Sequence, residues 1–597
     1  MGDDKRNMVL AIVLSVIVLF GWQFLADTFF PPAPVPVQQQ TTNQGSSEEP
    51  VVGSSIDSTL PSSVEGVVQS LRSRSEVLED TQRVTISSPR LQGSISLKGA
   101  RIDDLTLLDY TETVDPESAK IVLLEPSGSA QPYLAQFGWI GEGATAPGVD
   151  AVWTADRSTL TPDSPVTLSW TSPEGVVFEQ IISMDQDYLF SIKQNVRNGS
   201  DKTLTIVPYG RVFRTGTPDI LGFYILHEGL IGVFNETLSE IDYDDLLEKK
   251  KIEQETTGGW LGITDKYWLV ALVPDQTLPV TTTFNTPQAA NAIERYQADF
   301  VTEAVSIPAG GNHAMESKLF AGAKQTTLLD RYADTYGIKN FDLAIDFGWF
   351  YFLTKPIFYA IHWLHGILGN FGLAILALTV GIKALFFPLA NKSYKSMSKM
   401  KLLQPKMVEL KERYGDDRQK LQMEMMSLYK NEKVNPLSGC WPIMIQIPVF
   451  FSLYKVLFVT IEMRHAPGLM WINDLSAPDP FGILTVFGLV EWQIPALLAV
   501  VNIGAWPIIM GLTMWFQQKL NPAPADPIQA KVFAIMPIFF TFILASFPAG
   551  LVIYWAWNNS LSILQQYIIM KRMGVAIGGG SVADQEKEKE IAKAKDS

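Results

Sequence analysis

Long apolar runs constrain this chain more than any other feature of its sequence. An α-helix needs about 20 mostly apolar residues to cross the hydrocarbon core of a bilayer. Six runs reach or approach that length, namely Met8–Leu25, Phe371–Leu389, Cys440–Ile461, Pro495–Phe516, Val532–Phe547 and Leu551–Met570. The sequence therefore predicts a polytopic α-helical membrane protein with six transmembrane helices, the last five of which form a helical core.

The N-terminal run follows Lys5 and Arg6 and carries no charge. Cleaved signal peptides and uncleaved signal anchors both begin in this way. Cleavage after Ala26 would place bulky Phe24 where a small residue is wanted, so we favour an uncleaved anchor over residues 1–26. The segment that follows, 27–64, is rich in Pro, Gln, Ser and Thr and predicts a disordered linker.

Residues 65–340 have the pattern of an all-β domain. Short alternating runs, such as RVTIS at 83–87 and VTLSW at 166–170, are separated by turns that contain Pro, Gly, Asn and Asp. Helical stretches do not alternate with these runs, which argues against a parallel α/β sheet. We therefore predict a β-sandwich, followed by a helix over 325–336.

An aromatic-rich segment, DFGWFYFLTKPIFYAIHWLH at 346–365, predicts an interfacial amphipathic helix within 341–370. Lys355 and Pro356 interrupt it. We interpret His362 and His365 as interfacial polar groups, because two histidines do not make a metal site. The chain has one cysteine, Cys440, and five scattered histidines, so no metal or other cofactor is expected.

The distribution of basic residues predicts the orientation. The loop 391–435 has eleven Lys or Arg against six acids, whereas the loop 464–491 has one basic residue. By the positive-inside rule, the basic loop and both termini are cytoplasmic and the β-domain lies outside. The remaining expected parts are spans at 371–390, 437–461, 495–517 and 532–570 (two helices), a cytoplasmic region at 391–436, an outer loop at 462–494, a cytoplasmic loop at 518–531 and a cytoplasmic tail at 571–597.

The cytoplasmic region 391–436 predicts a helical hairpin. Its apolar positions at helical spacing are Met400, Leu403, Met407, Leu410 and Tyr414, then Leu421, Met425 and Leu428. Gly415-Asp416-Asp417 supplies the turn and an aspartate N-cap, and Pro405 should kink the first arm. The hairpin is basic and rich in Met, which favours internal packing together with contact to anionic lipid or a ribosome.

Several segments of the helical part resemble the YidC family of membrane protein insertases. They are FFPLANKSYKSMSKMKLLQPKM (386–407), EKVNPLSGCWPIMIQIPVFFSLY (432–454), WINDLSAPDP (471–480) and FPAGLVIYWAWNNSLSILQQY (547–567), in that order. In the β-domain, GGWLGITDKYW (258–268) is a weaker local likeness. The resemblance implies a β-supersandwich and a polar groove that receives hydrophobic segments of client proteins. It also implies a bacterial inner membrane, with the β-domain and the loop 462–494 in the periplasm.

The resemblance also implies which residues line that groove. A positive residue five positions before the proline of the first segment is Lys383, where many relatives have Arg. Thr379, Gln446, Trp555 and Asn559 match further groove positions, and we add Tyr554 from the polar last span. Lys455 departs from the family pattern. We expect it to lie away from Gln446 and to reach the outer interface.

Lys383 and the polar residues of the last span each allow two interpretations. Lys383 lies roughly 9 Å from the end of its run, at about 1.5 Å per residue. It could extend to the cytoplasmic interface, or it could face a hydrated cavity, which would avoid much of the insertion penalty of about 2.5–3.5 kcal/mol. The last span carries Tyr554, Asn558, Asn559, Ser562, Gln565 and Gln566. These side chains could join helices to one another or line a groove.

The expected function is insertion and folding of inner-membrane proteins, alone or with the Sec translocon. The partners would be nascent membrane proteins, lipid, the translocon and a ribosome, with no recognition of nucleic-acid sequence. The chain contains no nucleotide-binding or nucleophile motif, so no catalytic residue or enzyme activity is predicted. The alternatives are a secondary transporter with Lys383 in its substrate site, and a glycan-binding β-domain with the helices as an anchor.

Overall fold

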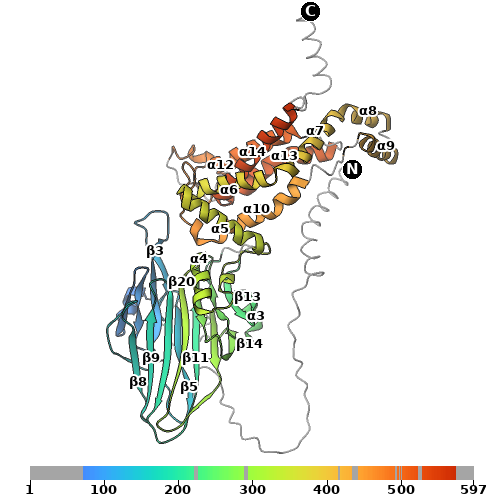
Figure 1. Ribbon diagram of the computed structural model, residues 1–597. Coiled ribbons are helices and arrows are strands. Elements are labelled where there is room, and N and C mark those ends of the chain that lie inside the picture. Colours follow the sequence, from blue (N-terminus) through green and yellow to red (C-terminus); the bar gives the residue numbers. More distant parts are fainter. Residues whose placement is uncertain are drawn as a thin grey trace, which may run out of the picture. The chain divides into compact units, whose positions relative to one another are not determined.

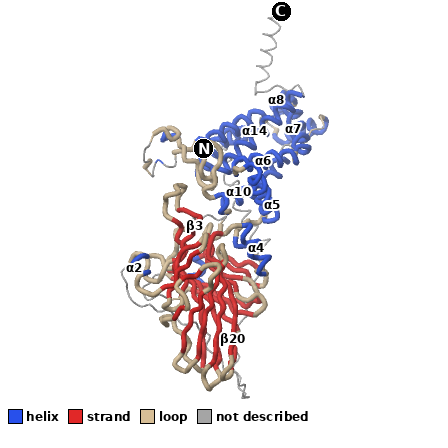
Figure 2. The backbone as a smooth tube through the Cα atoms, turned by 60° about the vertical axis from the view of Figure 1, so that its left-hand side comes forward, coloured by secondary structure: helices blue, strands red, loops and turns tan. Residues whose placement is uncertain are grey.

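A computed structural model describes residues 72–220, 226–287, 294–414, 417–432, 434, 441–490, 494–495, 498, 501–521 and 527–572. The expected N-terminal anchor, the linker and the C-terminal tail lie outside these residues, apart from Lys571 and Arg572. Strands occupy the first part of the described chain and helices the second, as the red and blue segments of Figure 2 show. An all-β domain followed by a helical region is therefore the architecture.

The β-domain consists of two sheets (Figure 1). The first has the order β14-β17-β18-β11-β5-β3-β2-β1-β7, and β19 and β4 pair with β11 and β3. Its strands are β1 (Arg83–Ser87), β2 (Leu91–Ser96), β3 (Arg101–Thr111), β4 (Lys120–Leu124), β5 (Tyr133–Glu142), β7 (Thr159–Leu160), β11 (Leu204–Thr215), β14 (Lys251–Thr257), β17 (Pro279–Asn285), β18 (Arg295–Thr302) and β19 (Val305–Ile307). Most neighbours pair antiparallel.

The second sheet has the order β13-β12-β15-β16-β20-β10-β9-β8-β6. Its strands are β6 (Thr154–Ala155), β8 (Val166–Thr171), β9 (Val176–Met184), β10 (Leu189–Asn198), β12 (Gly229–Phe234), β13 (Thr237–Asp242), β15 (Trp260–Thr264), β16 (Trp268–Val273) and β20 (Asn312–Ala323). Two short helices, α2 (Arg74–Leu78) and α3 (Tyr243–Lys249), accompany the sheets.

The two sheets pack face to face, as the alternating sequence predicts. Every second residue of β9, from Val176 to Met184, is buried. Trp139 of β5 packs against Phe178 of β9 with ring centroids 5.2 Å apart, which places one sheet's core residues on those of the other. Gln180 also donates from β9 to the carbonyl of Phe137 at 2.8 Å. The prediction of an all-β sandwich is confirmed.

The helical region follows α4 (Thr326–Tyr336) and the 3₁₀ turn η1 (Phe341–Ala344). Its elements are α5 (Tyr351–Leu368), α6 (Phe371–Leu385), α7 (Phe387–Leu402), α8 (Gln404–Tyr414), α9 (Arg418–Asn431), α10 (Trp441–Val459), η3 (Ile461–Met463), η4 (Ile483–Thr485), α12 (Ala505–Leu520), α13 (Pro527–Ile543), η5 (Leu544–Ser546) and α14 (Ala549–Arg572). Asp417 caps α9 by accepting from the backbone N–H of Lys420 at 3.0 Å, as predicted.

Two helices differ in extent from the apolar runs of the sequence. The run 371–389 is divided at Phe386, because Pro388 lacks an N–H and sits in the first turn of a new helix, α7. Among the described helices none has the length and apolar composition to cross a bilayer alone, but α6 and α7 meet both requirements together, with a 69° bend between them. The helix α12 begins at Ala505, ten residues after the start of the expected span.

Helix α5 has one buried and one exposed side, as an amphipathic helix requires. Thr354, Ile357, Phe358 and Ile361 are buried, whereas Phe352 and Trp363 are 74% and 66% exposed. The helix continues through Pro356 instead of being interrupted there.

Lys355 of α5 binds two carboxylates, Asp342 of η1 at 2.6 Å and Asp330 of α4 at 2.9 Å. These ion pairs attach α5 to α4, the helix that follows the last strand of the β-domain.

Glu462, directly after α10, makes a second link to the β-domain. Gln325 at the N-terminus of α4 gives no side-chain cap, and the Glu462 carboxylate instead accepts from the backbone N–H of Thr326 at 2.9 Å. Burial raises the pKa of Glu462 to about 7, although hydrogen bonds from its own backbone and from Thr326 act to lower it. Nearby, Arg464 donates to the carbonyl of Thr111 at 2.6 Å.

The raised pKa predicts that the contact between Glu462 and α4 weakens with rising pH. The seated carboxyl binds its proton more tightly than a free one, so stabilisation is complete below about pH 4.5 and is lost as pH rises through about 7. At about 1.4 kcal/mol per pKa unit, the loss is roughly 3 kcal/mol. Glu462→Gln keeps an acceptor without a charge and should remove this pH dependence.

The measurement is amide hydrogen exchange of α4 at a series of pH values, corrected for the intrinsic exchange rate. Wild-type α4 should lose protection between about pH 5 and pH 8, and the Gln variant should stay protected. An identical loss in both proteins would contradict the assignment of the effect to Glu462.

Candidate functional site

Lys383 occupies the last turn of α6, directly before the break at Phe386. Its ammonium group donates to the hydroxyl of Ser562 on α14 at 2.7 Å. Ser562 is 2% exposed and in turn donates to the carbonyl of Asn558 at 2.8 Å. In the described part of the chain Lys383 forms no ion pair with an acidic residue, so its positive charge is not neutralised by the protein.

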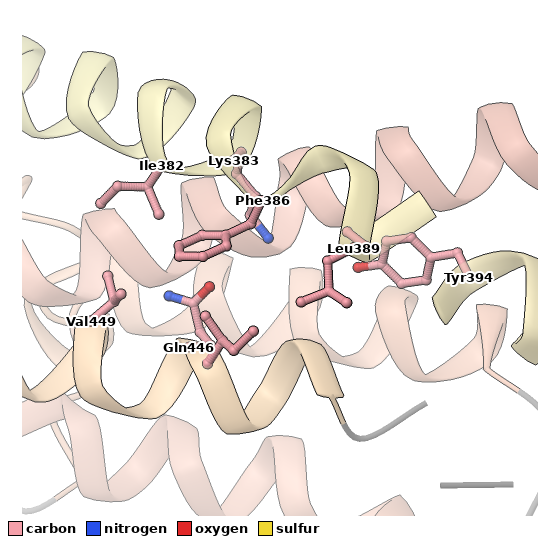
Figure 3. A pocket seen from close by; sticks show the side chains of 9 residues that line it. Ile382, Lys383, Phe386, Leu389, Tyr394, Gln446 and Val449 are labelled. Atoms are coloured by element: carbon pink, nitrogen blue, oxygen red, sulfur yellow. The ribbon is translucent and has the colours of Figure 1, made fainter. Parts of the chain in front are cut away.

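A small cavity lies beside Lys383. Its volume is about 30 Å³, and it is lined by Ile382, Lys383, Phe386, Leu389, Ala390, Tyr394, Ile445, Gln446 and Val449. Figure 3 shows the side chains of Lys383 and Phe386, from one side, and of Gln446, from α10, directed toward the same space. A volume of this size holds one or two water molecules and no extended peptide.

Gln446 connects the cavity to the last helix. Its side-chain amide donates to the hydroxyl of Tyr554, which is 2% exposed on α14. Tyr554 and Ser562 are eight residues apart, so their side chains lie two turns apart along α14. The two hydrogen bonds, Lys383 to Ser562 and Gln446 to Tyr554, therefore join α14 to α6 and α10 around the cavity.

The other predicted groove residues lie around this site but do not line the cavity. Thr379 is buried one turn before Lys383 and donates to the carbonyl of Ile375 in its own helix at 2.7 Å. Trp555 packs between Phe450 and Phe540, with ring centroids 4.7 and 5.7 Å away. Asn559 donates to the hydroxyl of Thr513 on α12 at 3.3 Å. Asn559 thus joins helices to each other, one of the two readings that the sequence left open.

The structure adds Ser562 and Tyr394 to the candidate site. Ser562 was one of the polar residues of the last span, but spacing alone did not pair it with a residue 179 positions away. Tyr394 lies in the segment 386–407 that carries the family resemblance, and it is buried. Lys455 lies outside the cavity lining, as expected, and forms an ion pair with Asp346 at 2.7 Å.

Removing the hydroxyl of Ser562 should destabilise the bundle. In Ser562→Ala the half-buried Lys383 ammonium loses this acceptor, at a cost of about 1 kcal/mol. Ser560→Ala is the matched control, because the Ser560 hydroxyl donates only within α14, to the carbonyl of Ala556. Thermal unfolding of both purified proteins in detergent measures the difference. Equal melting temperatures would contradict a stabilising contact.

Two family models match this chain. The family model for the YidC periplasmic domain matches residues 83–360, and the model for the 60Kd inner membrane protein matches residues 363–575. A membrane protein insertase YidC of Methylobacterium nodulans is 49% identical over 598 residues, covering 97% of this chain and 96% of that protein. The one of Nitrobacter hamburgensis is 48% identical and covers 97% of each chain.

A solved structure is also similar, a crystal structure of active YidC insertase with its first transmembrane domain resolved. It is 16% identical and covers 82% of this chain and 93% of that one, with a TM-score of 0.34. Identity near one half over nearly the whole length of both chains establishes the family. The chain belongs to the YidC family of membrane protein insertases and is therefore no enzyme.

Proposed function

We propose that this insertase receives the hydrophobic segments of its clients beside Lys383, between α6, α10 and α14. One observation carries the proposal: a lysine whose charge no acidic side chain of the described residues neutralises, held on a buried serine. A partly buried cation without an anionic partner is costly, and it attracts any acid that enters its surroundings. The acidic residues of a client's translocated tail are such a partner.

The attraction between the Lys383 ammonium and an acidic client tail depends on the position and the sign of the charge. At an intermediate dielectric, two unit charges a few ångströms apart interact by about 4 kcal/mol. The membrane potential adds about 2.3 kcal/mol per charge per 100 mV for an acidic tail that moves outward. Partition of the client's apolar segment into lipid supplies the remaining driving force. Nucleotide hydrolysis is not needed for this scheme, and the sequence has no Walker A motif for it.

The groove must widen before it can hold a client. The cavity of about 30 Å³ accepts water only, so a helical segment needs the lining side chains to separate. The 69° bend between α6 and α7, next to Lys383 and Pro388, is the natural hinge for that movement. Gln446, Tyr554, Thr379, Trp555 and Asn559 would then border the opened groove on its helix faces.

For the topology, we infer six transmembrane helices with both termini in the cytoplasm and the β-domain in the periplasm. The excess of basic residues in 391–435 supports this orientation. The exposed aromatic side of α5 suits the membrane interface, where Trp and Tyr are favoured. The basic pair α8 and α9 would contact anionic lipid or a ribosome, and cooperation with the Sec translocon fits a groove that opens to lipid.

A charge-exchange experiment tests the proposal. Lys383→Arg keeps position and sign and should insert clients almost as well as the wild type. Lys383→Glu should fail with a client whose translocated tail is acidic, because repulsion replaces attraction. The same client with a neutral tail should be inserted by the Glu variant at least several-fold better.

The readout is protease protection of the two client tails in cells with matched levels of each variant. Equal failure of the Glu variant on both clients would refute charge pairing and leave only a structural role for Lys383.

A further inference from the structure

The connection between α10 and α12 contains a long apolar segment, which we call the apolar loop; its described residues are 483–490, 494–495, 498 and 501–503. Between Asp479 and Lys519 the sequence has a single charged residue, Glu491. The described residues of the loop do not form an α-helix that continues α12, which begins only at Ala505. The insertase mechanism gives this segment no role.

Hydrogen bonds of Asp479 and a backbone bridge hold the two ends of the loop together. The Asp479 carboxylate accepts from the backbone N–H of Trp506 at 2.7 Å and of Phe481 at 3.0 Å, and from the Trp471 indole at 2.9 Å. Asp479 thereby caps the first turn of α12, for which Gly504 offers no side chain. Gly482 and Gly504 form a bridge that closes the loop. A Cβ at Gly482 would lie 1.9 Å from the side-chain amide of Asn502, so a larger residue there would displace the amide that holds the Leu484 N–H.

The backbone of the first half of the loop is hydrogen-bonded within the loop itself. Seven backbone N–H groups donate to acceptors between Gly482 and Ile503, namely those of Ile483, Leu484, Val486, Phe487, Gly488, Leu489 and Val490. The Leu484 N–H uses the Asn502 side chain, at 3.0 Å, and the others use carbonyls. Internal satisfaction of this kind is what a non-helical backbone needs in order to leave water.

Many described apolar side chains of the loop are exposed instead of packed into a core. Large apolar residues with at least a third of their surface exposed are Ile483, Val486, Phe487, Leu489, Val490, Leu498 and Val501. Leu489 reaches 83%. The β-domain exposes few residues of this kind, whereas α12, which follows the loop, exposes Leu512 at 53% and Phe516 at 54%. In its apolar exposure the loop thus resembles a lipid-facing helix, not a surface in water.

We propose that the apolar loop inserts into the outer leaflet of the membrane, with Leu489 and its neighbours among the lipid acyl chains. The proposal rests on the topology of the proposed function, in which α10 ends and α12 begins at the periplasmic surface. The two ends of the loop are held together at that surface by the bridge between Gly482 and Gly504. A satisfied backbone beneath the apolar side chains of 483–490, a stretch without charged residues, fits hydrocarbon, and it offers water or a polar partner almost nothing to bind.

Depth-dependent fluorescence quenching tests this insertion. Because Cys440 is the one cysteine, Cys440→Ser gives a background for single labels. An environment-sensitive dye is attached to Leu489→Cys in the loop, to Leu512→Cys on α12 or to Val152→Cys on the β-domain. Val152 is 67% exposed and serves as the label in water. The full-length proteins are reconstituted in vesicles of phosphatidylethanolamine and phosphatidylglycerol. Brominated acyl chains quench a label in lipid, and aqueous iodide quenches a label in water.

The label at Leu489 should be quenched several-fold more by brominated lipid than the label at Val152, and to an extent close to that at Leu512. Quenching by iodide should show the reverse order. A ratio of the two quenchings nearer to that of Val152 than to that of Leu512 would overturn the proposal. This result is independent of client insertion, so failure of the charge-exchange experiment at Lys383 would leave it intact.

Discussion

The hydrogen bond from Lys383 to Ser562 joins two helices far apart in sequence around a charge that the described protein does not neutralise. Lys383 can stay there only because α6 ends nearby, at the break imposed by Pro388, and because α14 presents a polar group at that depth. The polar side of α14 therefore joins the helices of the bundle, and in the proposed function it also borders the client site. Tyr554 binds α10 and Ser562 binds α6. Asn559 binds α12, and Gln566 binds Asn521, the residue that follows α12.

The β-domain is joined to this bundle by charged side chains, not by one apolar interface alone. Lys355 binds carboxylates of α4 and η1, and Glu462 caps the N-terminus of α4 from the end of α10. A third pair, Lys455 with Asp346, involves α10 again. Because α10 also carries Gln446, a movement of α10 on client entry would change the distances in these contacts. In the proposed function, these contacts would connect the β-domain to the client site.

The sequence predicted the classes of structure well and several connections poorly. Period-two alternation predicted the strand at 83–87 with its observed limits, because one buried face fixes such a pattern. Apolar composition did not reveal that α6 stops before Pro388 or that α12 begins at Ala505, since a run of apolar residues has the same composition whether it is helix or loop. The cap that Glu462 provides and the partner of Lys383 depend on packing between distant segments, which no local pattern encodes. Lys383 and Gln446 did meet at one cavity, because the family resemblance carried that information.

Site-specific photo-crosslinking during client insertion tests the central claim most directly. A benzophenone amino acid replaces Phe386, which lines the cavity beside Lys383, or Phe516, an exposed residue of α12 that serves as a matched aromatic control. The account predicts crosslinks from position 386 to the apolar segment of a stalled client, and far fewer from position 516. Crosslinking from position 516 with none from position 386 would contradict it, because clients would then pass along lipid-exposed α12 and not through the groove of Lys383.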